Sequence, residues 1–272
     1  MRHRVDFWAL ALLAPAFLLL LWLVVVPAAW SVAGAFPLEN FERAFAVYGA
    51  DIWFTTWLVT LSVLLIAVLA IAIGGYLTLG ASPVAVRVLA WLYRWPLFVP
   101  MVCAAQMMRS FLARNGMLNN TLVAAGAITQ AQAASLLDWR GIMITFVWKQ
   151  LPFVTLMTAG AMAALDRNLI EAARDLGASR VRVLIEIIVP LVRGPLLVAC
   201  VLTFVTLMSV LSVPVMLTAD SPTMITVDMA YRITTFGDYG TANALGVISY
   251  LLTMAAAWIY LRDAARQREV FR

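Results

Sequence analysis

Long apolar stretches recur along this chain of 272 residues, and each is long enough to cross a membrane as a helix. A helix crosses the hydrocarbon core of a bilayer, roughly 30 Å thick, with about 20 apolar residues. Hydrophobic residues make up 64% of the chain and charged residues 12%, far from the composition of water-soluble domains. The length leaves room for about six crossings with short connections, and for no large soluble domain.

We expect an all-α polytopic membrane protein that forms a single transmembrane domain over residues 1–272. The pattern predicts six transmembrane helices: Phe7–Trp30, Trp53–Leu79, Val88–Met108, Gly141–Leu165, Gly194–Leu217 and Thr241–Leu261. The first apolar stretch, of about 24 residues, is longer than the core of a signal peptide, so we expect an uncleaved helix. A signal peptide cleaved near Ala33–Ala35 is the alternative.

The arginines indicate how the chain lies in the membrane. With the N-terminus in the cytoplasm, thirteen arginines fall in inside segments and five in outside segments, namely Arg43, Arg109, Arg114, Arg140 and Arg232. The positive-inside rule then places both termini in the cytoplasm, which agrees with an even number of crossings. Because the arginines are scattered singly at the ends of apolar stretches, we expect no nucleic-acid partner.

The longest hydrophilic segment on the inside, residues 166–190, predicts two short helices joined at a glycine. Asn168 and Glu171 have the spacing of a capping box at the start of the first helix. Gly177 can adopt the left-handed conformation that ends a helix, and Ser179 suits the cap of the next one.

Apolar residues follow both helices of this segment at helical spacing. Leu169, Ala173 and Leu176 share one face of the first helix, and Leu184, Ile187, Ile188 and Leu191 form a stripe on the second. Pro190 is expected to interrupt the helix before the fifth crossing. The segment therefore predicts a charged knuckle, held on the membrane helices by its stripe, that docks in a cleft of a soluble partner. The alternative is a loop that only connects two crossings.

A resemblance to a known family favours the docking interpretation. Glu171, Ala172 and Ala173, followed at matching spacing by Gly177, Ile187 and Pro190, resemble the cytoplasmic loop of ATP-binding-cassette importer permeases. The similarity extends to Trp148–Phe153, Gly116–Asn119 and Pro100, and covers most of the chain from about Ala50 onward.

The resemblance implies that this chain lies in the bacterial inner membrane. It also implies that residues 166–190 form a cytoplasmic helix-turn-helix that inserts into a separate ATPase subunit. The ATPase-coupling residues it implies are Glu171, Ala172, Ala173, Gly177, Arg180 and Pro190. It further implies an ABC ATPase dimer that uses ATP and Mg²⁺, a second permease subunit (homologous or identical), and a periplasmic or lipid-anchored binding protein. This chain would bind no cofactor and form half of the translocation pathway.

The substrate class rests on finer similarity. The run from Glu171 to Ser179, with Gly237–Gly240 and Ala242–Leu245, is similar to permeases for polyamines, ferric iron, thiamine and phosphonates. Sugar permeases are the alternative, although they more often carry isoleucine, aspartate and glycine after the alanines.

Several residue types that enzymes and ion-coupled transporters need are absent or badly placed, which disfavours these function classes. The only lysine, Lys149, is not in a glycine-rich phosphate loop, so this chain is not expected to hydrolyse ATP by itself. His3 is the only histidine, and Cys103 and Cys200 lie in apolar stretches, so no metal site or histidine-based catalysis is expected. An ion-coupled secondary transporter is disfavoured because the carboxylates fall at the ends of the expected crossings or in loops. A membrane scaffold subunit is the third class.

Four residues are candidates for the substrate path. Lys149 lies within the fourth crossing, where an ionisable side chain is a functional candidate unless it pairs or reaches the interface. Thr206, Ser209 and Ser212 follow Thr203 in steps of three along the fifth crossing, where Pro214 is expected to cause a bend. Such hydroxyls line polar routes, and they also join helices in lipid.

Two outside segments complete the sequence interpretation. Leu118, Leu122 and Ala125 predict a short surface helix within Phe111–Arg140. The segment Thr218–Tyr239 is the candidate contact for a binding protein, through Asp220, Asp228, Arg232 and Asp238.

Overall fold

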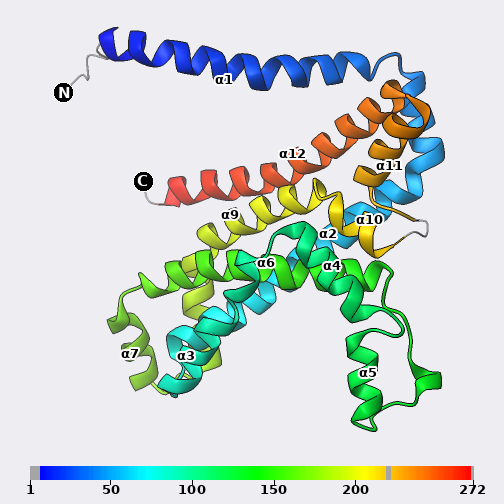
Figure 1. Ribbon diagram of the computed structural model, residues 1–272. Coiled ribbons are helices and arrows are strands. Elements are labelled where there is room, and N and C mark those ends of the chain that lie inside the picture. Colours follow the sequence, from blue (N-terminus) through cyan, green and yellow to red (C-terminus); the bar gives the residue numbers. More distant parts are fainter. Residues whose placement is uncertain (1–6, 219–221, 271–272) are drawn as a thin grey trace. The chain divides into compact units, whose positions relative to one another are not determined.

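The computed structural model describes the backbone of residues 7–218 and 222–270, and the side chains of 13–218, 222–258 and 262 (Figure 1). Every regular element in these ranges is a helix, which confirms the all-α prediction. Three of the thirteen inside arginines, Arg2, Arg4 and Arg272, lie outside the described residues, as do His3 and Asp220.

Five helices are long and apolar enough to cross a membrane, and a bent pair of helices gives a sixth crossing when the pair is counted as one span. The five are α1 (Phe7–Gly34), α2 (Glu39–Leu79), α6 (Trp139–Ala163), the continuous helix Arg180–Met208, and α12 (Tyr239–Val270). The predicted fold class, with about six transmembrane helices, is therefore confirmed.

The third crossing is broken, so the prediction of one helix over Val88–Met108 was wrong. It consists of α3 (Pro83–Leu92), the 3₁₀ turn η1 (Trp95–Phe98) and α4 (Met101–Leu112), and the helix axis bends by 108° at the break. Val99, which precedes Pro100, is extended, with φ −85° and ψ 123°. A proline disfavours the helical conformation in the preceding residue, which explains the position of the break.

The fifth crossing also differs from the predicted range Gly194–Leu217. It starts at Arg180, as α8 (Arg180–Val183), the π-helical turn η3 (Leu184–Ile188) and α9 (Val189–Met208). Pro190 does not interrupt it, because the wide π turn makes room ahead of the proline ring. The helix instead ends at Met208, and a short α10 (Ser212–Leu217) follows, so the break lies ahead of Pro214.

The chain divides into two compact units: residues up to Gly49 with Asp228–Tyr250, and Ala50–Val227 with the segment from Leu251. In the first unit, Ser31 of α1 donates a hydrogen bond to the side-chain oxygen of Asn243 in α12 at 3.2 Å. In the second unit, α6 packs on α9 and η1, and α10 packs on α4. The short segments beside the two breaks therefore belong to one packed region.

The segment between α4 and α6 contains α5 (Met117–Ala124), which confirms the predicted surface helix. The buried Asn119 amide donates to the carbonyl oxygens of Ala113, Arg114 and Ala134 at 3.1, 3.1 and 2.9 Å. One side chain thus ties the start of α5 to both flanking loops.

Candidate functional site

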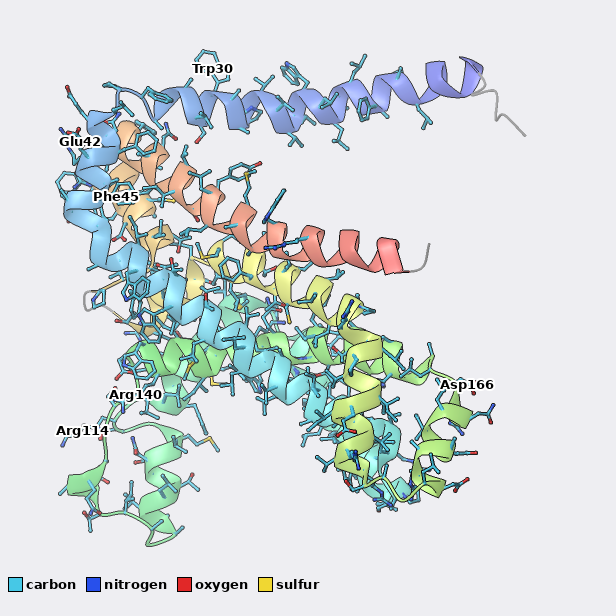
Figure 2. The ribbon with its side chains drawn as sticks, turned by 180° about the vertical axis from the view of Figure 1, so that it is seen from behind. Trp30, Glu42, Phe45, Arg114, Arg140 and Asp166 are labelled. Atoms are coloured by element: carbon cyan, nitrogen blue, oxygen red, sulfur yellow. The ribbon has the colours of Figure 1, made fainter. Side chains whose placement is uncertain are left out.

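The segment between α6 and α9 forms two helices joined at a glycine, as predicted. Its first helix, α7 (Arg167–Asp175), begins at Asp166, which is labelled in Figure 2. The Asp166 carboxylate accepts a hydrogen bond from the Asn168 backbone N–H at 2.9 Å. The predicted capping box of Asn168 and Glu171 was therefore wrong, because the helix starts earlier and the aspartate occupies the cap position.

Gly177 ends α7 in the predicted left-handed conformation, with φ +86°. The Ala178 N–H donates to the Ala173 carbonyl and the Gly177 N–H donates to the Arg174 carbonyl, which is the pattern of a Schellman motif. The Ser179 hydroxyl accepts from the Arg182 N–H at 3.3 Å and caps α8, as predicted. The turn between the two helices is thus held by two backbone hydrogen bonds at Gly177 and Ala178 and by the side-chain cap of Ser179.

An apolar cluster holds the base of this segment on the membrane helices. Val183, Ile188 and Val192 are buried with Met162 of α6, and Ile170 and Ala173 of α7 pack against them. The predicted stripe is confirmed for Leu184, Ile187 and Ile188, which belong to this cluster. It was wrong for Leu191, which is 53% exposed, because the extra residue in the π turn shifts the buried position to Val192.

α2 approaches this base closely through a pair of glycines. A Cβ atom placed on Gly75 would lie 2.6 Å from Cδ2 of Leu184, and one on Gly74 would lie 3.0 Å from the sulfur of Met162. A larger residue at Gly75 would fit only if Leu184 moved. Glycine at this position therefore allows Leu184 to pack directly on α2.

The outer face of the segment is exposed and partly apolar. Leu176, the C-cap residue of α7, is 90% exposed and Leu169 is 52% exposed, whereas Ile170 and Ala173 of this helix pack on the apolar cluster. The predicted coupling residues Glu171, Ala172, Gly177, Arg180 and Pro190 are exposed, and Ala173 is half-buried. The ion pair of Arg182 with Glu186, at 2.8 Å, is exposed and contributes little stability.

Lys149 lies beside the break in the third crossing. Its ammonium group donates hydrogen bonds to the carbonyl oxygens of Pro96 and Leu97 at 3.0 and 3.3 Å. These two carbonyls belong to η1, where the α-helical hydrogen-bond pattern is interrupted. The Pro96 carbonyl also accepts from the Val99 N–H at 3.3 Å, so the lysine adds a second donor there and ties η1 to α6.

The hydroxyl candidates of the fifth crossing gather at its break. Thr206 is exposed and donates to the Leu202 carbonyl at 2.8 Å, whereas Ser209 caps α9 and bonds the Val205 and Thr206 carbonyls. Ser212 is the first residue of α10 and is half-buried. The structure thus brings these three to one end of α9, apart from Lys149 in α6.

Two polar residues of α2 were not singled out by the sequence interpretation. Asp51 is buried inside the long helix, and its carboxylate accepts from the Thr223 N–H at 2.7 Å. The Thr55 hydroxyl accepts from the Ile225 N–H at 3.0 Å, at the start of α11 (Ile225–Tyr231). These side chains cap a helix some 170 residues away in sequence. The sequence interpretation used only neighbouring residues, so it had no signal for this contact.

The outer residues Arg232 and Asp238 contact each other. The Arg232 guanidinium lies 3.4 Å from the Asp238 carboxylate, and its Nε donates to the Tyr48 hydroxyl at 2.5 Å. A hydrogen bond from the Thr241 N–H, at 3.0 Å, and the charges of Arg232 and Arg43 hold the pKa of Asp238 below its usual value. This arrangement fastens the turn before α12 to the first part of α2.

Comparison with known proteins identifies the family. Residues 6–268 match the family described as binding-protein-dependent transport system inner membrane component. The chain is 28% identical to the sulfoquinovosyl glycerol transport system permease SmoG of Agrobacterium fabrum, over 93% of this chain and 89% of SmoG. It is 31% identical to the spermidine/putrescine permease PotB of Escherichia coli, over 61% of this chain and 60% of PotB.

The fold agrees with this assignment. A chain of a bacterial alginate ABC transporter, crystallised with a pentasaccharide-bound periplasmic protein, superposes with a TM-score of 0.82 at 18% identity. That superposition covers 96% of this chain and 95% of the other. The chain therefore belongs to the family of binding-protein-dependent transport system inner membrane components, the permease subunits of ATP-binding-cassette importers.

Proposed function

We propose that α7 and the turn at Gly177 are the point where a separate ATPase drives this permease. The observation that carries the proposal is the exposed Leu176, 90% accessible at the end of α7, a helix that Ile170 and Ala173 hold on the apolar cluster. An apolar side chain on a rigid turn suits the cleft of a partner, where its burial would stabilise the complex by about 1.5–3 kcal/mol. Glu171, Ala172, Gly177 and Arg180 are the further residues proposed to take part in coupling to the ATPase.

The partners follow from the family. An ABC ATPase dimer would use ATP and Mg²⁺, and this chain would form one half of the translocation path with a second permease subunit. A periplasmic or lipid-anchored binding protein would deliver the substrate on the side of the membrane opposite α7. This orientation, with both termini in the cytoplasm, rests on the excess of arginines in the inside segments.

The path would pass the two broken crossings. Helix breaks inside a membrane are tolerated where they line a cavity or are buried in protein, and they often coordinate substrates. Thr206, Ser209 and Ser212 lie at one break and Lys149 lies at the other, so they are the candidates for contacts with the substrate.

Two substrate classes are candidates, and each is supported by a similar permease. The similarity of the segment after Glu171 favours a polyamine, phosphonate, ferric iron or thiamine permease, and PotB is a polyamine permease by name. A sugar substrate is the alternative, supported by SmoG and by the trehalose/maltose permease MalF of Thermococcus litoralis, 30% identical over 47% of this chain. Mass spectrometry of the ligand retained by the intact purified complex would distinguish them.

Coupling is tested by Leu176→Asp in the complex with its ATPase. We expect the charged side chain to abolish co-purification of the ATPase, while the permease still inserts and gives the wild-type elution volume. Met117→Asp is the matched control, because Met117 is also exposed, at 69%, on the distant helix α5. Full co-purification and uptake with Leu176→Asp would contradict the proposed docking site.

A further inference from the structure

A cavity of about 650 Å³ lies behind α7, between this helix, α3, α6 and the end of α2. Figure 1 shows α3 and α7 at the same end of the molecule, and Figure 2 shows the base of α7 at Asp166. This volume is within the range of small-ligand pockets. The space exists because α6 turns small residues toward it, namely Ala159, Gly160 and Ala163.

Three arginines converge on this cavity from two elements. Arg167 and Arg174 come from α7, at a spacing of two helical turns, and Arg94 comes from the junction of α3 with η1. Among the described residues, none of the three forms an ion pair with a carboxylate. Glu171 is the single acidic residue in the lining, so the cavity carries a net charge excess of two positive groups (three arginines against one glutamate).

The uncharged polar groups of the lining already have partners. The Tyr93 hydroxyl accepts from Nε of Arg94 at 3.2 Å, and the Thr78 hydroxyl donates to the Gly74 carbonyl at 2.9 Å. The first bond orients Arg94 and leaves its terminal guanidinium nitrogens as donors. Arginine guanidinium groups bind phosphate oxygens in a bidentate way, so three of them form a receptor for a phosphate group.

The neighbouring surface is suited to a lipid. Arg94 also lines a second, apolar hollow together with Trp91, Trp95 and Phe98, which are 60, 59 and 83% exposed. Tryptophans concentrate at the level of lipid headgroups, and basic pockets between membrane helices on the cytoplasmic side bind anionic headgroups. A phosphate in the cavity would therefore have an apolar surface beside it for its acyl chains.

We propose that the cavity lined by Arg94, Arg167 and Arg174 binds a phosphate-bearing ligand, in the membrane the headgroup of an anionic phospholipid. The bound phosphate bridges α3 to α7 and so restrains the helix that meets the ATPase. The regulatory consequence rests on the proposed coupling function, whereas binding itself does not.

Binding is measured by native mass spectrometry of the full-length permease with added phosphatidylglycerol or phosphatidylcholine, and by calorimetric titration with inorganic phosphate. We expect preferential retention of phosphatidylglycerol, weakened at least about ten-fold by the triple variant Arg94→Gln, Arg167→Gln, Arg174→Gln. Arg87→Gln is the matched control, because Arg87 is on α3 and lines only the second hollow. It should retain phosphatidylglycerol like the wild type.

A steric variant tests the cavity without changing a charge. A Cβ atom on Gly160 meets no atom within 4 Å, so Gly160→Leu fills the space and should also weaken binding. If inorganic phosphate binds and the triple variant weakens this binding as well, the site is supported and a soluble phosphate is its ligand. Equal retention by all variants, or an equal loss in Arg87→Gln, would overturn the proposal.

Failure of the cavity and failure of the coupling function are distinguishable. Wild-type permease that binds phosphatidylglycerol but never co-purifies with an ATPase would contradict only the coupling function. A complex that keeps its ATPase with unchanged lipid binding in the triple variant would overturn only the cavity.

Discussion

The ammonium group of Lys149 donates a hydrogen bond to the carbonyl oxygen of Pro96 across 53 residues of sequence, at 3.0 Å. A second bond reaches the Leu97 carbonyl at 3.3 Å. The only lysine of the chain thus supports the break between α3 and α4.

Replacing Lys149 by methionine should lower the stability of the permease, because two carbonyls of η1 lose their hydrogen bonds from the ammonium group. Hydrogen bonds to charged groups contribute about 1.5–3 kcal/mol, so a clear decrease in the thermal midpoint in detergent is expected. Lys149→Arg, which keeps the charge and the donors, is the control. Unchanged stability of Lys149→Met together with lost uptake would instead assign the lysine to substrate contact.

Gly75→Val should displace Leu184 and loosen the base of the segment that contains α7, because the valine Cβ would lie 2.6 Å from the leucine side chain. Overpacking of this kind typically costs about 1–3 kcal/mol. The change is measured as a lower thermal midpoint and reduced co-purification of the ATPase. The added variant Leu184→Ala should restore part of both, and Gly160→Ala, where space is open, should be neutral. Additive losses in the double variant would contradict the direct contact.

Gly177→Val should impair coupling more than it impairs insertion. A β-branched residue at φ +86° is strained, and the Schellman turn that positions Leu176 would be lost. We expect loss of transport-coupled ATPase stimulation with a normal yield in the membrane. Gly177→Asn, which tolerates the left-handed region, should retain most of the stimulation. Normal uptake by Gly177→Val would count against the importer mechanism proposed for this loop.

Acid should destabilise the turn at Asp238. Its folded pKa is lower than the unfolded value of about 3.9, chiefly because of the hydrogen bond from the Thr241 backbone N–H. The contribution to stability is therefore complete above the unfolded pKa and is lost as the pH falls through the lower folded pKa. Thermal melting between about pH 6 and 3 should show this decline, and Asp238→Asn should flatten it. The same acid dependence in both proteins would show that another group is responsible.

Asn119→Ala should release the α5 segment, because three backbone carbonyls lose hydrogen bonds from one buried amide. A loss of about 1–3 kcal/mol in local stability is expected, measured as faster proteolysis between α4 and α6. Asn120→Ala is the matched control, since the exposed Asn120 makes a single bond to the Asn115 carbonyl. Equal proteolysis of the two variants would contradict the role of Asn119.

Much of the protein was predictable from local sequence. Apolar stretches of about 20 residues determine six crossings, because a helix is the way in which such a segment satisfies its backbone in lipid. Gly177 and Ser179 specify the turn after α7 through their own conformational preferences and hydrogen bonds. These features depend on residues only a few positions apart.

The rest was decided by contacts between distant segments. Pro100 alone did not reveal a 108° break, since Lys149 must approach from α6 to satisfy the carbonyls that the break exposes. The π turn that moves the buried position from Leu191 to Val192 depends on packing against α6. The convergence of Arg94 with Arg167 and Arg174 likewise exists only when α3 and α7 fold against the same helix, because charges far apart in sequence become one site only through tertiary structure.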